Sequence, residues 1–93
     1  MTEDNIALDR PTRLKRLRMR AWRRGMKEMD MILGPFVDKK GESLTDAELS
    51  ALEILMDRQD QQLFLWISGA STAPDDAKSA ERDIVDRITR GFG

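Results

Sequence analysis

Short apolar stripes at helical spacing recur along this sequence of 93 residues, and breaker residues separate them. The clearest stripe is Leu49, Leu52, Leu55 and Met56, whose intervals of three and four residues place them on one helical face. Tyrosine is absent and β-branched residues are few, which argues against a sheet. A chain of this length can bury one small core. The pattern therefore predicts an all-α fold, a compact bundle of five short helices.

The first two helices are predicted on either side of Gly25. We expect one helix over residues 12–23 and a second from about residue 25 to residue 33. Gly34-Pro35 should end the second helix, because proline lacks the amide donor and disfavours helix in the residue before it. Residues 38–41 are then expected to form a turn.

The third helix has the clearest start signal in the chain. Thr45 and Glu48 have the spacing of a capping box, in which each side chain accepts a hydrogen bond from the other residue's amide. Leu44 and Leu49 stand where a hydrophobic staple would place them. The sequence thus fixes the beginning of this helix at about Thr45.

Two further helices complete the predicted bundle. The fourth is expected over residues 61–68 with Asp60 as its N-cap. The fifth is expected over residues 74–90, because Pro74 suits a first helical position and the two acids after it suit the positive end of the helix dipole. Its predicted inward residues are Ala77, Ala80, Ile84 and Ile88. Residues 1–10 lack a hydrophobic period and are predicted to be a flexible tail before a single domain over residues 11–93.

The basic residues are concentrated in one part of the chain. Nine of the 16 Lys and Arg residues lie between Arg10 and Lys27, a segment without an acid, although the net charge is −1. A short helix crowded with bases is typical of nucleic-acid binders, but the acidic remainder of this chain would repel phosphate. We favour a positive face that meets an acidic protein surface. A basic-helix nucleic-acid binder or a generic interaction adaptor is the alternative.

Histidine and cysteine are both absent. Their absence excludes the usual zinc ligands and every Ser–His or Cys–His catalytic arrangement, and no carboxylate pair is spaced for acid–base work. We therefore expect no catalytic residue, no metal site and no enzymatic activity of the chain itself. The first nine residues carry three acids and no base, unlike a targeting peptide, and no apolar run could span a membrane. A soluble cytoplasmic protein is expected.

Several large side chains fall away from the apolar stripes. Met19 and Met31 do so clearly, which makes them candidates for an adaptable binding surface. Trp22 and Trp66 lie near the stripes, so each is either an interface anchor or a packed, half-exposed indole.

The charge changes sign around Gly25, between Arg24 and Glu28. These two charged residues are four apart and could form a helix-surface ion pair worth a few tenths of a kcal/mol. A glycine inside a helix would cost about 1 kcal/mol relative to alanine. Gly25 is therefore expected either to end the first helix or to let another backbone come close. In both cases a bend would present Arg24 and Glu28 to a partner, and the arginine fork could clamp a carboxylate or a carbonyl.

Four pieces of the chain, in order, resemble one known family. They are Arg23-Arg24-Gly25-Met26-Lys27-Glu28-Met29-Asp30, Ile32-Leu33-Gly34-Pro35-Phe36, Leu44-Thr45-Asp46-Ala47-Glu48 and Asp60-Gln61-Gln62-Leu63-Phe64-Leu65-Trp66. The first contains the Arg-Gly-x-x-Glu pattern of the SdhE family, the succinate dehydrogenase flavinylation factors. The resemblance covers residues 13–68 well, whereas the first helix is longer and more basic than in some bacterial members.

The resemblance implies a five-helix assembly factor that is not itself an oxidoreductase. Its partner would be the flavoprotein subunit of succinate dehydrogenase, and of fumarate reductase where present, to which it promotes covalent attachment of FAD. FAD would then belong to the client and would not be held stably by this chain, which is expected to act as a monomer without nucleic acid or membrane insertion. The family pattern places the partner-binding surface at Arg24, Gly25 and Glu28. Its expected rim contacts are Arg23, Lys27 and Asp30.

Overall fold

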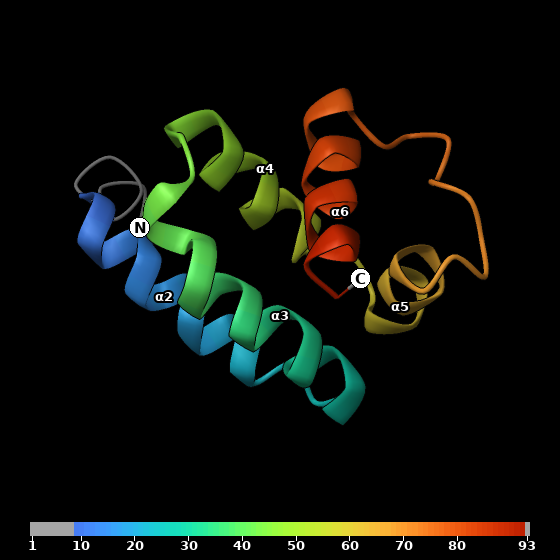
Figure 1. Ribbon diagram of the computed structural model, residues 1–93, viewed down its shortest axis with the longest axis horizontal. Helices are drawn as coiled ribbons and strands as arrows, with labels where there is room; N and C mark the ends of the chain where they lie inside the picture. Colours follow the sequence, from blue (N-terminus) through green and yellow to red (C-terminus); the bar gives the residue numbers. More distant parts are fainter. Residues whose placement is uncertain (1–8, 93) are drawn as a thin grey trace.

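The computed structural model describes residues 9–92, whose helices enclose one apolar core (Figure 1). The elements follow in the order α2 (Arg10–Trp22), α3 (Lys27–Lys40), the 3₁₀ turn η1 (Gly41–Ser43), α4 (Asp46–Leu55), α5 (Asp60–Ile67) and α6 (Ser79–Phe92). No strand occurs between residues 9 and 92. The prediction of an all-α fold with five α-helices is confirmed.

The helices α2 and α3 form an antiparallel pair, and α4, α5 and α6 pack beside it (Figure 1). The helix α6 contacts α3, α4 and α5, so it closes the bundle. The core takes side chains from all five helices, among them Leu17, Met29, Leu33, Leu52, Leu63 and Ile88. Among the described residues, no helix is both long enough and apolar enough to cross a membrane.

The helix α2 begins two residues before the predicted position. Asp9 is its N-cap, and the Asp9 carboxylate accepts a hydrogen bond of 2.9 Å from the amide of Thr12. The Thr12 side chain, together with this amide bond, lowers the pKa of the Asp9 carboxyl. Residues 1–8 of the predicted tail lie outside the described residues, so only its boundary at residue 10 can be compared with the structure.

The prediction that Gly34-Pro35 ends the second helix was wrong. The helix α3 continues through Pro35 to Lys40, and the predicted turn at residues 38–41 is helix and η1. Proline inside a helix removes one backbone hydrogen bond and costs about 3 kcal/mol. The next two residues, Phe36 and Val37, are 7% and 0% exposed, so continuing the helix buries both of them. Burying two such side chains contributes about 1.5–3 kcal/mol each, which offsets the defect.

The helix α4 begins as the sequence predicts. Thr45 is the N-cap, its hydroxyl accepts from the Glu48 amide at 3.1 Å, and the Thr45 amide donates to the Glu48 carboxylate at 2.8 Å. The backbone bond from Thr45, together with Arg87, lowers the pKa of the Glu48 carboxyl although partial burial opposes this. Leu44 and Leu49 are both buried, as a staple requires. The capping box is therefore confirmed.

The starts of the last two helices differ from the prediction. Gln59, rather than Asp60, is the N-cap of α5. Residues 74–78 are not helical, because the Ala77 amide donates to the Pro74 carbonyl at 3.0 Å and closes a turn before α6 begins at Ser79. Ala80 is exposed and Glu81 is buried, which reverses the predicted orientation at this point. Ile84 and Ile88 are buried as predicted.

A buried ion pair explains the inward position of Glu81. Its carboxylate is 2% exposed and accepts from Arg58 at 2.8 and 3.2 Å and from the Lys78 amide at 3.2 Å. Arg58 also binds Asp76 and lies over the Trp66 ring, 5.9 Å from its centroid. The Arg58 bonds hold the pKa of the Glu81 carboxyl below its ordinary value despite burial. Arg58 thereby attaches α6 and the loop before it to the connection between α4 and α5.

Candidate functional site

The bend, by which we mean residues 23–30 (the connection between α2 and α3 with the first turn of α3), contains every residue of the predicted partner-binding surface. The helix α2 ends at Trp22, α3 begins at Lys27, and Gly25 between them has a φ of +92°. L-residues rarely adopt this conformation, so glycine is required here to end α2. A Cβ added at Gly25 would meet nothing within 4 Å. Of the two roles expected for this glycine, the structure confirms that Gly25 ends α2. No other part of the described chain comes close enough to Gly25 to require the absence of a side chain.

Asp30 holds the backbone of the bend. It lies in the first turn of α3, and its carboxylate accepts a hydrogen bond of 2.8 Å from the Arg24 amide. Asp30 is half-buried, and its position at the positive end of the α3 dipole suits a carboxylate. Besides being a predicted rim contact, Asp30 therefore has a structural role.

The side chain of Arg24 points into the protein. Its guanidinium donates to the Asp60 carboxylate at 2.6 Å, to the Arg58 carbonyl at 2.9 Å and to the Met56 carbonyl. Only 9% of the side chain is exposed. The arginine fork does clamp a carboxylate and carbonyls, but those of its own chain. The expectation that the bend leaves the Arg24 guanidinium free for a partner was wrong, and the possible surface pair with Glu28 does not form.

The remaining residues of the predicted surface face solvent. Arg23, Gly25, Lys27 and Glu28 are all exposed. None of their charged side chains forms an ion pair within residues 9–92. The bend therefore presents two bases, one acid and the exposed backbone of Gly25. Such groups can make charge-assisted hydrogen bonds to another protein.

A shallow pocket of about 310 Å³ lies beside the bend. Its lining adds residues that the sequence did not indicate: Arg20, Arg58, Gln59 and Asp60. Arg24 and Asp60 are 36 positions apart in the chain, and no local pattern links them. The available signal was Asp60, which begins the fourth piece that resembles the family and for which we predicted only the role of an N-cap.

Most of the nine basic residues between Arg10 and Lys27 are neutralised within the protein. Five of the nine bases pair with acids of other elements: Arg10 with Asp46, Arg13 with Glu53, Arg18 with Asp38 and Glu42, Arg20 with Asp57, and Arg24 with Asp60. The hydrogen bond to Glu53 raises the pKa of Arg13 further. A protein that binds nucleic acid needs its bases free for phosphates. The ion pairs therefore weaken the nucleic-acid alternative.

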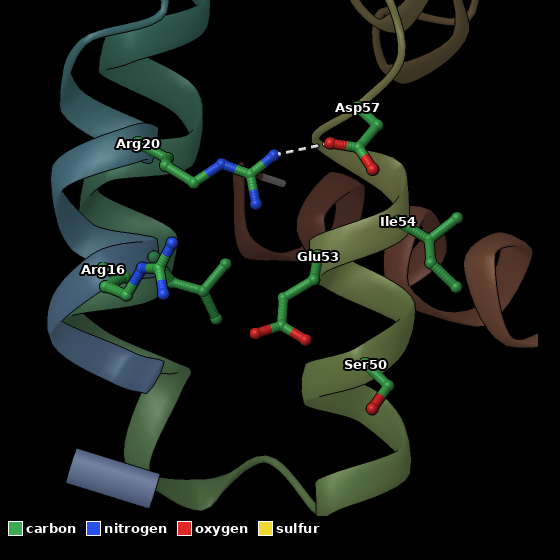
Figure 2. Close-up of a pocket in the computed structure, with 7 residues that line it drawn as sticks. Arg16, Arg20, Ser50, Glu53, Ile54 and Asp57 are labelled. Carbon is green, nitrogen blue, oxygen red and sulfur yellow. Dashed lines mark hydrogen bonds and ion pairs between the residues drawn. The ribbon is translucent and has the colours of Figure 1, made fainter. Parts of the chain in front are cut away.

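Figure 2 shows the open groove of about 390 Å³ between α2 and α4, with the bond between Arg20 and Asp57 across it. Glu53 and Ser50 line the α4 side, and Arg16 lines the α2 side (Figure 2). The bases Arg16 and Arg20 of α2 face the acids Glu53 and Asp57 on the other side of this groove, so it offers no concentrated charge of one sign to a ligand. Among residues 9–92, no group of three or more carboxylates could hold a metal ion.

A family model described as flavinator of succinate dehydrogenase matches residues 15–91. This chain belongs to that family. Family members are named as a flavinator or as assembly factors, which agrees with the expectation that the chain is not an enzyme in its own right. The match includes α3, α4 and α5 entirely, most of α2 and α6, and the whole bend.

Curated relatives agree with the family. An FAD assembly factor SdhE of Acetobacter pasteurianus is 34% identical over 98% of this chain and 83% of the relative. One of Aliivibrio fischeri is 38% identical over 73% of this chain and 76% of the relative. A mitochondrial succinate dehydrogenase assembly factor 2 of Mycosarcoma maydis is 34% identical over 70% of this chain but only 27% of the relative. No solved structure gives a significant match.

Proposed function

We propose that this protein binds the flavoprotein subunit of succinate dehydrogenase, and that of fumarate reductase where one is present, and promotes covalent attachment of FAD to it. The observation that carries the proposal is the bend, whose Arg-Gly-x-x-Glu pattern leaves Gly25 and Glu28 exposed on a rigid support. Arg23, Lys27 and Asp30 surround this centre. Arg24 supports it through its partly buried hydrogen bonds to Asp60 and to the Met56 and Arg58 carbonyls. Membership of the flavinator family supports the choice of client.

The bend is held rigid from below, which favours a binding role. Arg24 connects it to the loop between α4 and α5, and Asp30 fixes the backbone immediately before Gly25. A surface ordered before binding loses little conformational entropy when it binds. The client can then be held in one arrangement by contacts with the exposed backbone and with Glu28.

Binding energy alone suffices for this mechanism. The covalent bond forms between the flavin and the client's own residue, so the assembly factor needs to supply no reacting group. A protein that binds the attachment-competent arrangement of the client more tightly than the others shifts the client toward it. A tenfold preference corresponds to about 1.4 kcal/mol, which one or two charge-assisted hydrogen bonds can provide.

FAD itself is proposed to stay with the client. Phosphate groups are commonly held by a glycine-rich loop that opens a helix. The two glycines with positive φ among the described residues, Gly25 and Gly69, stand singly, and only Gly25 precedes a helix within a few residues. This donor set does not fit a dinucleotide. We expect a titration of the isolated protein with FAD to show weak binding or none, and tight binding would contradict this part of the proposal.

The decisive experiment combines the protein with apo flavoprotein subunit and FAD. Flavin fluorescence that stays with the flavoprotein after denaturation measures covalent attachment. The wild-type protein should accelerate attachment, and Glu28→Ala should abolish most of the acceleration without altering the helical circular dichroism. An unchanged rate with the wild-type protein, compared with none added, would refute the proposal.

Substitution of Gly25 can be tested in the same assay, with Gly69 as the matched control. Gly69 also has a positive φ, +85°, and a Cβ there likewise meets nothing within 4 Å. Leucine at either position should therefore introduce a similar backbone strain of about 1–2 kcal/mol. We expect Gly25→Leu to stop client flavinylation and Gly69→Leu to retain it. Equal losses in both variants would assign the effect of Gly25 to strain alone.

A further inference from the structure

Among the residues whose burial the structure describes, five large hydrophobic side chains are exposed, and three of these lie on the α2–α3 pair: Met19, Trp22 and Met31, which are 47%, 41% and 55% exposed. On α2, Lys15, Met19 and Trp22 follow at intervals of four and three residues, so they share one helical face. Trp22 lies against Gly34 of α3, and Met31 is one turn before that glycine. We call these three side chains the Trp22 patch.

The indole at the centre of this patch is fixed in place. A Cβ at Gly34 would overlap the Trp22 ring, so the glycine allows the ring to lie against the α3 backbone. The indole N–H donates to the Asp38 carboxylate at 3.1 Å. Tryptophan and arginine dominate the binding energy of protein interfaces, and methionine is enriched in them. A half-exposed tryptophan held in one orientation can bind a partner with little loss of side-chain entropy.

The patch is bordered by bases that the fold does not neutralise. Lys15 lies beside it on α2, Arg23 follows Trp22, and Lys27 is four residues before Met31 on α3. All three are exposed, and none forms an ion pair within residues 9–92. Two of them, Arg23 and Lys27, also belong to the bend. The surface is thus an apolar centre with a positive border, continuous with the residues proposed to bind the client.

We propose that the Trp22 patch is a second contact surface for the client flavoprotein, where it receives a segment that carries an apolar side chain flanked by Asp or Glu. This inference rests on the proposed function, since it names how the same client is held. The positive border selects an acidic segment, and the exposed Met and Trp side chains select an apolar residue within it. A nucleic acid fits this face less well, because only three of the described bases border it without an ion pair. Asp38, which accepts the indole N–H at the centre of the face, is paired with Arg18 at 3.7 Å.

Single glutamate substitutions test the apolar centre. Met19→Glu and Met31→Glu place a like charge opposite an acidic segment at positions where the side chain is already exposed, so both variants should keep the wild-type circular dichroism. We expect each to weaken binding of the flavoprotein by about tenfold or more in a titration. Leu65→Glu is the matched control, because Leu65 is 44% exposed but lies on α5. It should bind as the wild type does.

The charged border has its own matched pair. Lys15→Glu should weaken flavoprotein binding several-fold, and the loss should shrink as salt concentration rises. Lys78→Glu makes the same change in net charge on an exposed residue of the loop before α6, and it should leave binding unchanged.

The outcomes separate the two proposals. Failure of the wild-type protein to bind the flavoprotein would overturn the proposed function. Wild-type binding that Met19→Glu, Met31→Glu and Lys15→Glu leave unchanged would overturn the Trp22 patch alone. Salt-dependent retention on RNA that these variants lose, with flavoprotein binding intact, would also overturn it, because the partner at this face would then be a nucleic acid.

Discussion

Replacing Arg24 with alanine is expected to destabilise the protein before it affects any contact with a partner. The substitution removes the bonds to Asp60, to the Arg58 carbonyl and to the Met56 carbonyl. Hydrogen bonds to a charged group contribute about 1.5–3 kcal/mol each. Asp60 is 22% exposed, so water can hydrate its carboxylate once the guanidinium is gone and recover part of this energy. We therefore expect the free energy of unfolding to fall by about 2–4 kcal/mol, near the range for breaking a buried ion pair.

Urea denaturation followed by circular dichroism measures this loss. For a domain of this size each kcal/mol lowers the melting temperature by about 4–8 °C, so the change should exceed 8 °C. Arg24→Lys should fall between the wild type and Arg24→Ala, because an ammonium cannot reproduce the planar fork. Arg23→Ala is the control: the neighbouring arginine is exposed and forms no ion pair within the described residues, so stability should change by less than about 0.5 kcal/mol.

The two roles of Arg24 predict opposite combinations of stability and activity. If Arg24 supports the bend from within, flavinylation by Arg24→Ala should recover at low temperature, where the variant is folded. A variant that is as stable as the wild type yet inactive at every temperature would refute the reasoning. Arg24 would then act by direct contact with the client.

Three further substitutions test other parts of the fold. Glycine to alanine stabilises an ordinary helix by about 1 kcal/mol. At Gly34 the added Cβ would overlap the Trp22 ring, so Gly34→Ala should instead destabilise the protein by about 1 kcal/mol or displace the indole. The melting temperature measures the first outcome and tryptophan fluorescence the second. Because the folded-state pKa of the Glu81 carboxyl is lowered, the unfolded state binds more protons at this group in acid. The contribution of Glu81 to stability should therefore be constant above about pH 4.5 and fall below it. In Glu81→Gln this acid-dependent loss, measured by denaturation at several pH values, should be smaller. Thr45→Ala should cost about 1 kcal/mol in the same denaturation assay, through loss of the α4 cap alone.

Local signals in the sequence predicted the structure where local interactions decide it. The capping box at Thr45 and the stripe along α4 need only neighbours within four residues, and both are confirmed. Gly25 ends α2 for a reason that lies in its own backbone. Met19 and Met31 were expected at the surface because they fall off the stripes, and both are exposed.

The errors arose where distant residues decide the outcome. The continuation of α3 through Pro35 depends on a core that accepts Phe36 and Val37. The turn at Pro74 places Asp76 within 3.1 Å of Arg58, which belongs to another part of the chain. Arg24 turns inward because Asp60 and two carbonyls stand beneath it, 32 to 36 positions away. No spacing rule within one helix carries such information.

Arg58 gives the bend a dependence on the far end of the chain. Its carbonyl accepts from Arg24, while its guanidinium binds Glu81 of α6. One residue therefore links the first interhelical bend to the last helix. A peptide that contains only residues 23–30, or a fragment that stops before α6, would carry the Arg-Gly-x-x-Glu letters without the shape they have here. The motif can be transplanted to another scaffold only together with the α4–α5 loop and the helix that holds it.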